Sequence, residues 1–151
     1  MSYRSSFSYS EWQTLLFAPL WSFNAVAAID GKVDDKEAEA LAKEVADASL
    51  YRNELASEVL GDLGASFASV FSAYRADSRS VLDGLREAAQ LVDRKTIPDI
   101  ALGYKKAIIG VGVQVANASG AMFGSKMSED EKKALVLVAV TLGVRPEDLT
   151  S

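Results

Sequence analysis

The stretch Asp30-Gly31-Lys32-Val33-Asp34-Asp35-Lys36-Glu37 decides how this 151-residue chain is organised. It separates two apolar segments, the first ending near Ile29. The second continues after Glu37 with apolar residues at the three, four and seven spacing of one helical face. Gly31 can adopt the left-handed backbone conformation that ends a helix. The stretch therefore predicts a turn between two helices.

A variant of this turn recurs near the other end as Gly124-Ser125-Lys126-Met127-Ser128-Glu129-Asp130-Glu131. Placing Val33 on Met127 also aligns Ala40 with Ala134 and Leu41 with Leu135. In both copies an apolar segment with helical spacing is followed by a turn, then by a cap residue, and then by a Glu three positions after the cap. The sequence therefore predicts two related helix–turn–helix halves joined by a helical middle.

The other segments also show helical spacing, and no sustained two-residue alternation indicates a sheet. Ser10 is suited to cap a first helix, and Pro19 is suited to the first turn of a second helix that runs to about Ile29. In the middle of the chain, Gly61 and Gly64 are predicted to separate two helices. The aromatic stripe that follows them has core spacing, and its members are Phe67, Val70, Phe71 and Tyr74.

A long helix is predicted from Asp99 to about Met122, at the centre of the fold, because its glycines lower helix propensity unless neighbours pack closely against them. Ser128 is predicted to cap the last main helix, which ends at Leu142-Gly143, and a short turn follows near Pro146. We expect an all-α fold: a single compact bundle of about seven helices over residues 1–151, with residues 1–10 loosely held.

Composition excludes several classes of function. The chain has no Cys and no His, so a thiolate nucleophile, an imidazole base and the usual zinc sites are ruled out. The net charge of −5 disfavours nucleic acid. Arginines such as Arg79 and Arg86 alternate with Asp83 and Glu87, which indicates a solvated helix face. We expect a protein that is not an enzyme.

Two apolar runs resemble membrane signals. The run from Leu15 to Ala28 lacks the positively charged lead of an export signal, and cleavage there would sever the helix before Asp30. The run from Ala107 to Ser125 approaches spanning length but is diluted by polar residues and glycines. Both runs are interpreted as core helices, so a cytoplasmic protein with no membrane span is expected.

The carboxylates of the two turns have two interpretations. Asp34 with Glu37, and Ser128 with Glu131, have the spacing of capping boxes, and this interpretation is favoured. The alternative is a site for Ca²⁺ or Mg²⁺, which prefer oxygen ligands. Capping leaves Asp30 without a role. The candidate metal ligands are Asp30, Asp34, Glu37 and Glu131.

Three segments resemble the TerB-like family, the helical tellurite-resistance domain: residues 27–37, residues 127–131 and the ending Thr141-Leu142-Gly143-Val144-Arg145-Pro146-Glu147-Asp148. The resemblance implies an all-α domain with an acidic, metal-binding surface where the two turns approach, and Asp30, Glu37 and Glu131 carry over. It also implies protein partners and stress response without catalysis. The second half departs from the pattern, with Gly124 or Ser125 where Asp is expected.

Two functions are carried forward. The first is a non-catalytic TerB-like stress-response or interaction module with a weak divalent-metal site at the Asp30–Glu37 turn. The alternative is a structural helical adaptor or homodimer with no ligand, for which aromatic side chains near the start offer a partner surface. These side chains are Tyr3, Phe7, Tyr9 and Trp12. Acid–base catalysis by Asp30 with Glu131 is a third, weaker reading.

Overall fold

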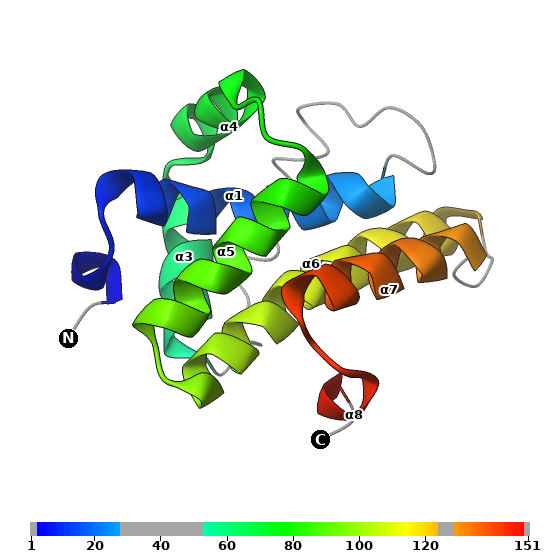
Figure 1. Ribbon diagram of the computed structural model, residues 1–151. Coiled ribbons are helices and arrows are strands. Elements are labelled where there is room, and N and C mark those ends of the chain that lie inside the picture. Colours follow the sequence, from blue (N-terminus) through cyan, green and yellow to red (C-terminus); the bar gives the residue numbers. More distant parts are fainter. Residues whose placement is uncertain (1–2, 28–52, 124–128, 150–151) are drawn as a thin grey trace.

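The computed structural model describes residues 3–27, 53–123 and 129–149, and for 114–123, Pro146 and Leu149 it describes the backbone alone. In these ranges the chain forms helices and no strand, which confirms the predicted all-α class. Figure 1 shows their arrangement. The elements are η1 (Tyr3–Ser6), α1 (Tyr9–Ala27), α3 (Glu54–Ala65), α4 (Phe67–Ala76), α5 (Val81–Lys95), α6 (Pro98–Phe123), α7 (Glu129–Leu142) and α8 (Pro146–Leu149).

The long helix predicted from Asp99 is α6, and it packs against α1, α3, α5 and α7. Its glycines allow this close packing. A Cβ on Gly112 would lie 2.7 Å from the Leu135 side chain of α7 and 3.1 Å from Ser22 Oγ of α1. Gly103 faces the side chain of Asn53 in the same way. The propensity cost of glycine in α6 is therefore offset by contact with three neighbouring elements.

The expected break at Pro19 is wrong, because α1 continues through this residue from Tyr9 to Ala27. Proline has no backbone N–H, so the carbonyl oxygen of Leu15, four residues earlier, loses its helical donor. The phenol of Tyr104 replaces that donor: its hydroxyl donates to the Leu15 oxygen at 2.8 Å from the buried face of α6. A tertiary hydrogen bond thus lets one helix form where the sequence indicates two.

The expected break at Gly61 and Gly64 is also misplaced. Both glycines lie inside α3, and the chain turns at Ser66, between α3 and α4. Asn53 caps α3, because its side-chain oxygen accepts from the backbone N–H of Ala56 at 2.9 Å. The cap and the apolar face of α3 outweigh the low helix propensity of glycine.

The predicted end of the last main helix is confirmed at Gly143. Gly143 has φ +81°, the left-handed conformation that glycine adopts at little cost. The Val144 N–H donates to the Ala139 oxygen at 2.9 Å, so a carbonyl left free by the helix end is satisfied. The short predicted turn at Pro146 is α8.

An aromatic cluster holds α1 against α4 and α5. Phe17 and Tyr74 each meet the Trp21 ring edge-on, with ring centroids 5.6 and 6.1 Å away. Gly84 of α5 lies directly against the Trp21 indole, where a side chain would not fit. In the predicted stripe, Phe67 and Val70 are buried while Phe71 and Tyr74 are partly buried against the core. The core interpretation of this stripe is therefore confirmed.

The start of the chain contacts the helices in the described range. The Tyr3 N–H donates to Glu58 Oε2 at 2.8 Å, and Phe7 is buried with its ring 5.9 Å from that of Trp12. Trp12 is also buried, whereas Tyr9 is exposed. The aromatic residues proposed as a partner surface are therefore mostly core residues, and Tyr9 alone of the four is left open to solvent.

No helix in residues 3–27, 53–123 and 129–149 is both long enough and apolar enough to cross a bilayer. The predicted correspondence between two halves depends on residues 28–52 and 124–128, which lie outside the described ranges. The same holds for the capping boxes begun by Asp34 and Ser128.

Candidate functional site

Of the four predicted metal ligands, Glu131 falls within the described residues. Asp30, Asp34 and Glu37 lie outside them. Glu131 is in the first turn of α7, and 3% of its surface is exposed. It is the one buried acidic side chain in the part of the chain that the structure describes. This burial distinguishes Glu131 from the other acidic side chains of the described residues, which are exposed or partly exposed.

The position of Glu131 follows from the inward face of α7. Glu131, Val138 and Leu142 recur at helical spacing and are all buried, in a helix that packs against α1, α5 and α6. Its neighbours Glu129 and Asp130 are exposed. No group of three or more acidic, His or Cys side chains that could hold a metal occurs within residues 3–27, 53–123 and 129–149. A site at Glu131 would therefore need ligands from outside these ranges, where the predicted Asp30–Glu37 turn lies.

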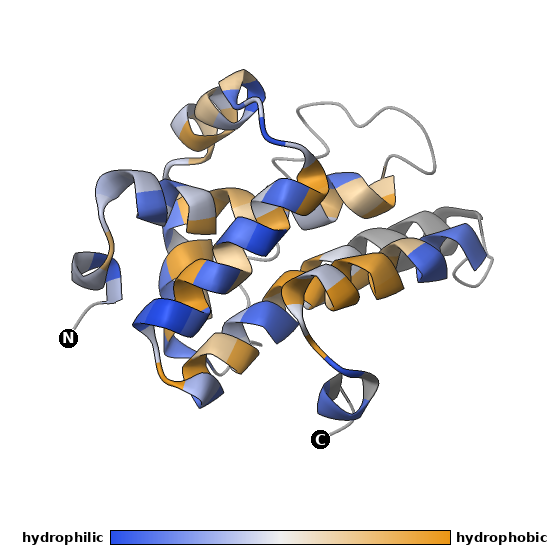
Figure 2. Cartoon of the chain, viewed as in Figure 1, coloured by the Kyte–Doolittle hydropathy of each residue, from blue (hydrophilic) through white to orange (hydrophobic). Residues whose placement is uncertain are grey.

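The opposite side of α7 carries three exposed aliphatic side chains, which we call the α7 apolar face: Val136, Leu137 and Val140. Their exposed fractions are 62%, 48% and 66%. Figure 2 shows α7 changing from hydrophilic at its first turns to hydrophobic along the rest. On a solvent-facing helix, polar residues normally occupy these positions. An unbroken apolar run, from Ala134 to Val140, was the available sequence signal for this face.

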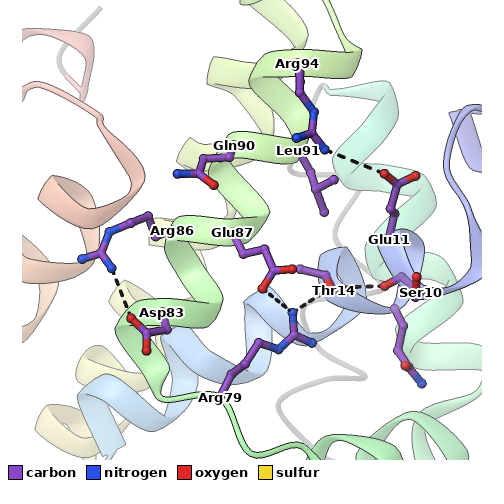
Figure 3. A pocket seen from close by; sticks show the side chains of 11 residues that line it. Ser10, Glu11, Thr14, Arg79, Asp83, Arg86, Glu87, Gln90, Leu91 and Arg94 are labelled. Atoms are coloured by element: carbon purple, nitrogen blue, oxygen red, sulfur yellow. Dashed lines mark hydrogen bonds and ion pairs between the residues drawn. The ribbon is translucent and has the colours of Figure 1, made fainter.

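A polar groove of about 710 Å³ lies between α1 and α5 (Figure 3). It is lined by Ser10, Glu11, Gln13, Thr14, Arg79, Asp83, Arg86, Glu87, Gln90, Leu91 and Arg94. Its three arginines pair with carboxylates of the same groove: Arg79 with Glu87 at 2.8 Å, Arg86 with Asp83 at 3.2 Å and Arg94 with Glu11 at 3.8 Å. Because these charges balance, the groove has no excess charge with which to attract an ionic ligand.

The helix-face interpretation of Arg79 is wrong, because Arg79 precedes α5 and joins several elements. Its guanidinium donates to Asp77 at 2.9 Å and to Thr14 Oγ1 of α1 at 2.9 Å, and it stacks 4.9 Å from the Trp21 ring centroid. The hydrogen bonds with Arg79 lower the pKa of Asp77, and the same bonds raise the pKa of Arg79. Arg79 therefore locks α1 to the start of α5.

Glu11 performs a similar linking role at the other end of the groove. Its carboxylate accepts from Lys95 Nζ of α5 at 2.7 Å and from the Ser8 N–H at 2.8 Å. These bonds, with Lys95 the larger cause, hold the pKa of Glu11 at about 2. The strongest electrostatic contacts of the groove thus join helices of the same chain, which explains them without a ligand.

Comparisons of this chain with protein-family models, curated proteins and solved structures give no match. Within the described residues, α7 carries the buried Glu131 and the exposed apolar face on opposite sides of one helix.

Proposed function

We propose that this chain is a non-catalytic, TerB-like interaction module that binds another protein surface through the α7 apolar face. The observation that carries the proposal is the exposure of Val136, Leu137 and Val140 side by side on one helix. Aliphatic side chains grouped in this way lose contact with water when a partner covers them, and this is the main favourable term in protein association.

The charge balance of the α1–α5 groove supports a binding function over catalysis. An enzyme would need groups that are poised to transfer protons or attack a substrate, whereas the arginines and carboxylates of the groove are committed to one another. The α7 apolar face, by contrast, is exposed and is not covered by other described residues of the chain. A helix that packs into this face is the partner whose chemistry fits it.

Covalent trapping tests this function. A photo-crosslinking residue placed at position 140, in cells that naturally produce the protein, should give a discrete adduct. The same residue at position 97 should not, since Ile97 is equally exposed (64%) but lies away from α7. Val136→Lys in the same chain should abolish the position-140 adduct. It should leave stability within about 0.5 kcal/mol, because the replaced side chain is exposed. No adduct at position 140 beyond that at position 97 would contradict the proposal.

A weak divalent-cation site is the second component of the proposal, and the burial of Glu131 favours it. A carboxylate is a suitable ligand for Ca²⁺ or Mg²⁺, and the remaining oxygens would come from Asp30, Asp34 and Glu37. Such a cation would bridge the two predicted turns and stabilise the folded state without taking part in a reaction.

Thermal unfolding with added cation tests this component. Millimolar Ca²⁺ or Mg²⁺ should raise the melting temperature. At a cation concentration of about ten times the Kd, the free energy of unfolding should increase by about 1.4 kcal/mol. Glu131→Gln should remove the increase, whereas Glu129→Gln, at an exposed carboxylate two residues earlier, should keep it. An unchanged melting temperature for the wild type in both cations would eliminate the cation site and leave the interaction proposal untouched.

A further inference from the structure

A second pocket, of about 280 Å³, lies where α1 and α4 meet η1 and the end of α3. We call it the Trp12 pocket. Its aromatic lining comes from Tyr9 and Trp12 of α1, and its two charged residues are Arg4 of η1 and Asp62 of α3. This volume is below the usual range for drug-sized ligands, so the pocket fits one long side chain or a molecule of that size.

Asp62 gives the pocket an available carboxylate. The Trp12 indole N–H donates to Asp62 Oδ2 at 2.9 Å, which holds the carboxylate beside the aromatic lining. Asp62 is exposed, and it forms no ion pair with any described residue, Arg4 included. A carboxylate has about four acceptor positions, so a cationic donor can pair with Asp62 while the hydrogen bond from Trp12 stays in place.

Arg4 shows which cation suits the aromatic lining. Its guanidinium carbon lies 5.4 Å from the centroid of the Trp12 ring, which is within the range of a cation–π contact. Arg4 belongs to the four-residue helix η1, which is joined to α3 by the hydrogen bond from the Tyr3 N–H to Glu58. The chain therefore places a guanidinium of its own against this pocket, on a short segment.

We propose that the Trp12 pocket binds the side chain of an arginine from another protein, and that Arg4 partly occupies this site in the free chain. A planar guanidinium stacks on an aromatic ring and also donates two parallel hydrogen bonds to a carboxylate, whereas the ammonium group of lysine lacks this geometry. Asp62 supplies the carboxylate, which Arg4 does not use. The site is independent of the α7 apolar face, because none of its lining residues belongs to α7.

Two further features favour a protein as the source of the arginine. Tyr9 lines the pocket and is 74% exposed, so it offers a ring that a larger partner can cover. The chain has a net charge of −5, which favours the approach of a basic partner.

The two tryptophans provide separate reporters of binding in solution NMR. The indole N–H of Trp12 lies at the pocket, whereas Trp21 is buried against Gly84 and serves as the internal reference. Titration with N-acetylarginine methylamide should shift the Trp12 indole signal to saturation and leave that of Trp21 unchanged. N-acetylcitrulline methylamide has nearly the same shape without the charge, and it should shift neither signal.

Asp62→Asn tests the carboxylate and preserves the contact with α1, because an asparagine side-chain oxygen still accepts the Trp12 indole N–H. This variant should weaken binding of the arginine compound by about tenfold or more, since a charged hydrogen-bond partner is lost. Asp83→Asn, at an exposed carboxylate of α5 outside the pocket, should leave the affinity unchanged.

Arg4→Ala tests the competition. It should strengthen binding about two- to fivefold, because the guanidinium that stacks on the Trp12 ring is removed. Arg75→Ala is the matched control and should leave the affinity unchanged, since Arg75 stacks on the Phe71 ring at 5.6 Å and does not line the pocket.

Several results would overturn the site. One is a Trp12 indole signal that does not move in either the wild type or the Arg4→Ala variant. Another is an equal response to the citrulline compound, and a third is binding that Asp62→Asn leaves intact. These outcomes are measured at Trp12, so they do not alter the cross-linking result expected at position 140.

A peptide titration tests the source of the arginine. One arginine within a short glycine–serine peptide should bind at least as tightly as N-acetylarginine methylamide, because the peptide also contacts the exposed Tyr9 ring. Much weaker binding of the peptide would overturn the protein source and assign the pocket to a free guanidinium compound.

Discussion

Tyr104→Phe should destabilise the protein by about 1–3 kcal/mol, although it removes a single oxygen atom. The lost hydroxyl is the donor to the Leu15 carbonyl oxygen, at 2.8 Å in the core. Pro19 cannot supply the usual helical N–H, so the carbonyl would stay buried without a donor. Urea unfolding of both proteins measures the difference.

A double-mutant cycle isolates the role of Pro19. Pro19→Ala restores a backbone N–H four residues after Leu15, so Tyr104→Phe should cost less in that background. Tyr74→Phe is the matched control: its hydroxyl bonds to the Asn24 side chain, and its removal should cost the same with either residue at position 19. An equal cost of Tyr104→Phe in both backgrounds would show that the phenol does not replace the missing donor.

Burial is consistent with this role for Tyr104. The side chain is fully buried, and burial raises the pKa of its phenol well above the ordinary value. The hydroxyl therefore stays protonated and able to donate at neutral and moderately alkaline pH. We expect the effect of Tyr104→Phe on stability to be the same at neutral and moderately alkaline pH.

Gly84→Ala should destabilise the protein by about 1–3 kcal/mol, although alanine is the better helix former by about 1 kcal/mol. The added Cβ would lie 2.6 Å from Trp21 Cδ2 and closer still to two other atoms of the indole. Trp21 cannot move aside, because it is buried between Phe17, Tyr74 and the Arg79 guanidinium. Chemical unfolding measures the loss.

Gly61→Ala is the matched control for this prediction. Gly61 lies inside α3, and a Cβ built on it meets no atom within 4 Å. Without a clash, the gain in helix propensity remains, and the variant should be more stable by about 0.5–1 kcal/mol. Opposite signs for the two substitutions are expected. A stabilising Gly84→Ala would show that α5 does not approach Trp21 as closely as described.

The interior of the bundle could be predicted from helical spacing where the apolar pattern was strong. The start of the long central helix, its role at the centre and the stop at Gly143 follow from residues that act locally. The breaks expected at Pro19, Gly61 and Gly64 were wrong for one reason. Proline and glycine have unfavourable helix propensities, and contacts with residues far apart in sequence can offset them.

For the candidate site, the sequence identified Glu131 by its spacing from Ser128 but could not show that it is buried. Capping would leave the side chain near the helix end, whereas the structure buries Glu131 to 3% exposure in a helix that packs against α1, α5 and α6. The sequence could not predict which side of α7 is exposed to solvent, because the residues of α7 do not specify how many other helices pack against it.

Capping residues, glycine and apolar spacing act over a few residues, so the sequence was enough to predict an all-α fold and to propose two related halves from the turns at Asp30 and Glu131. The tertiary structure decided how the helices pack. The Tyr104 hydroxyl replaces the helical donor that Pro19 lacks in α1, and Gly84 leaves space for the Trp21 indole. One side of α7 is exposed. These outcomes depend on packing between residues far apart in sequence, and such packing leaves no local signal.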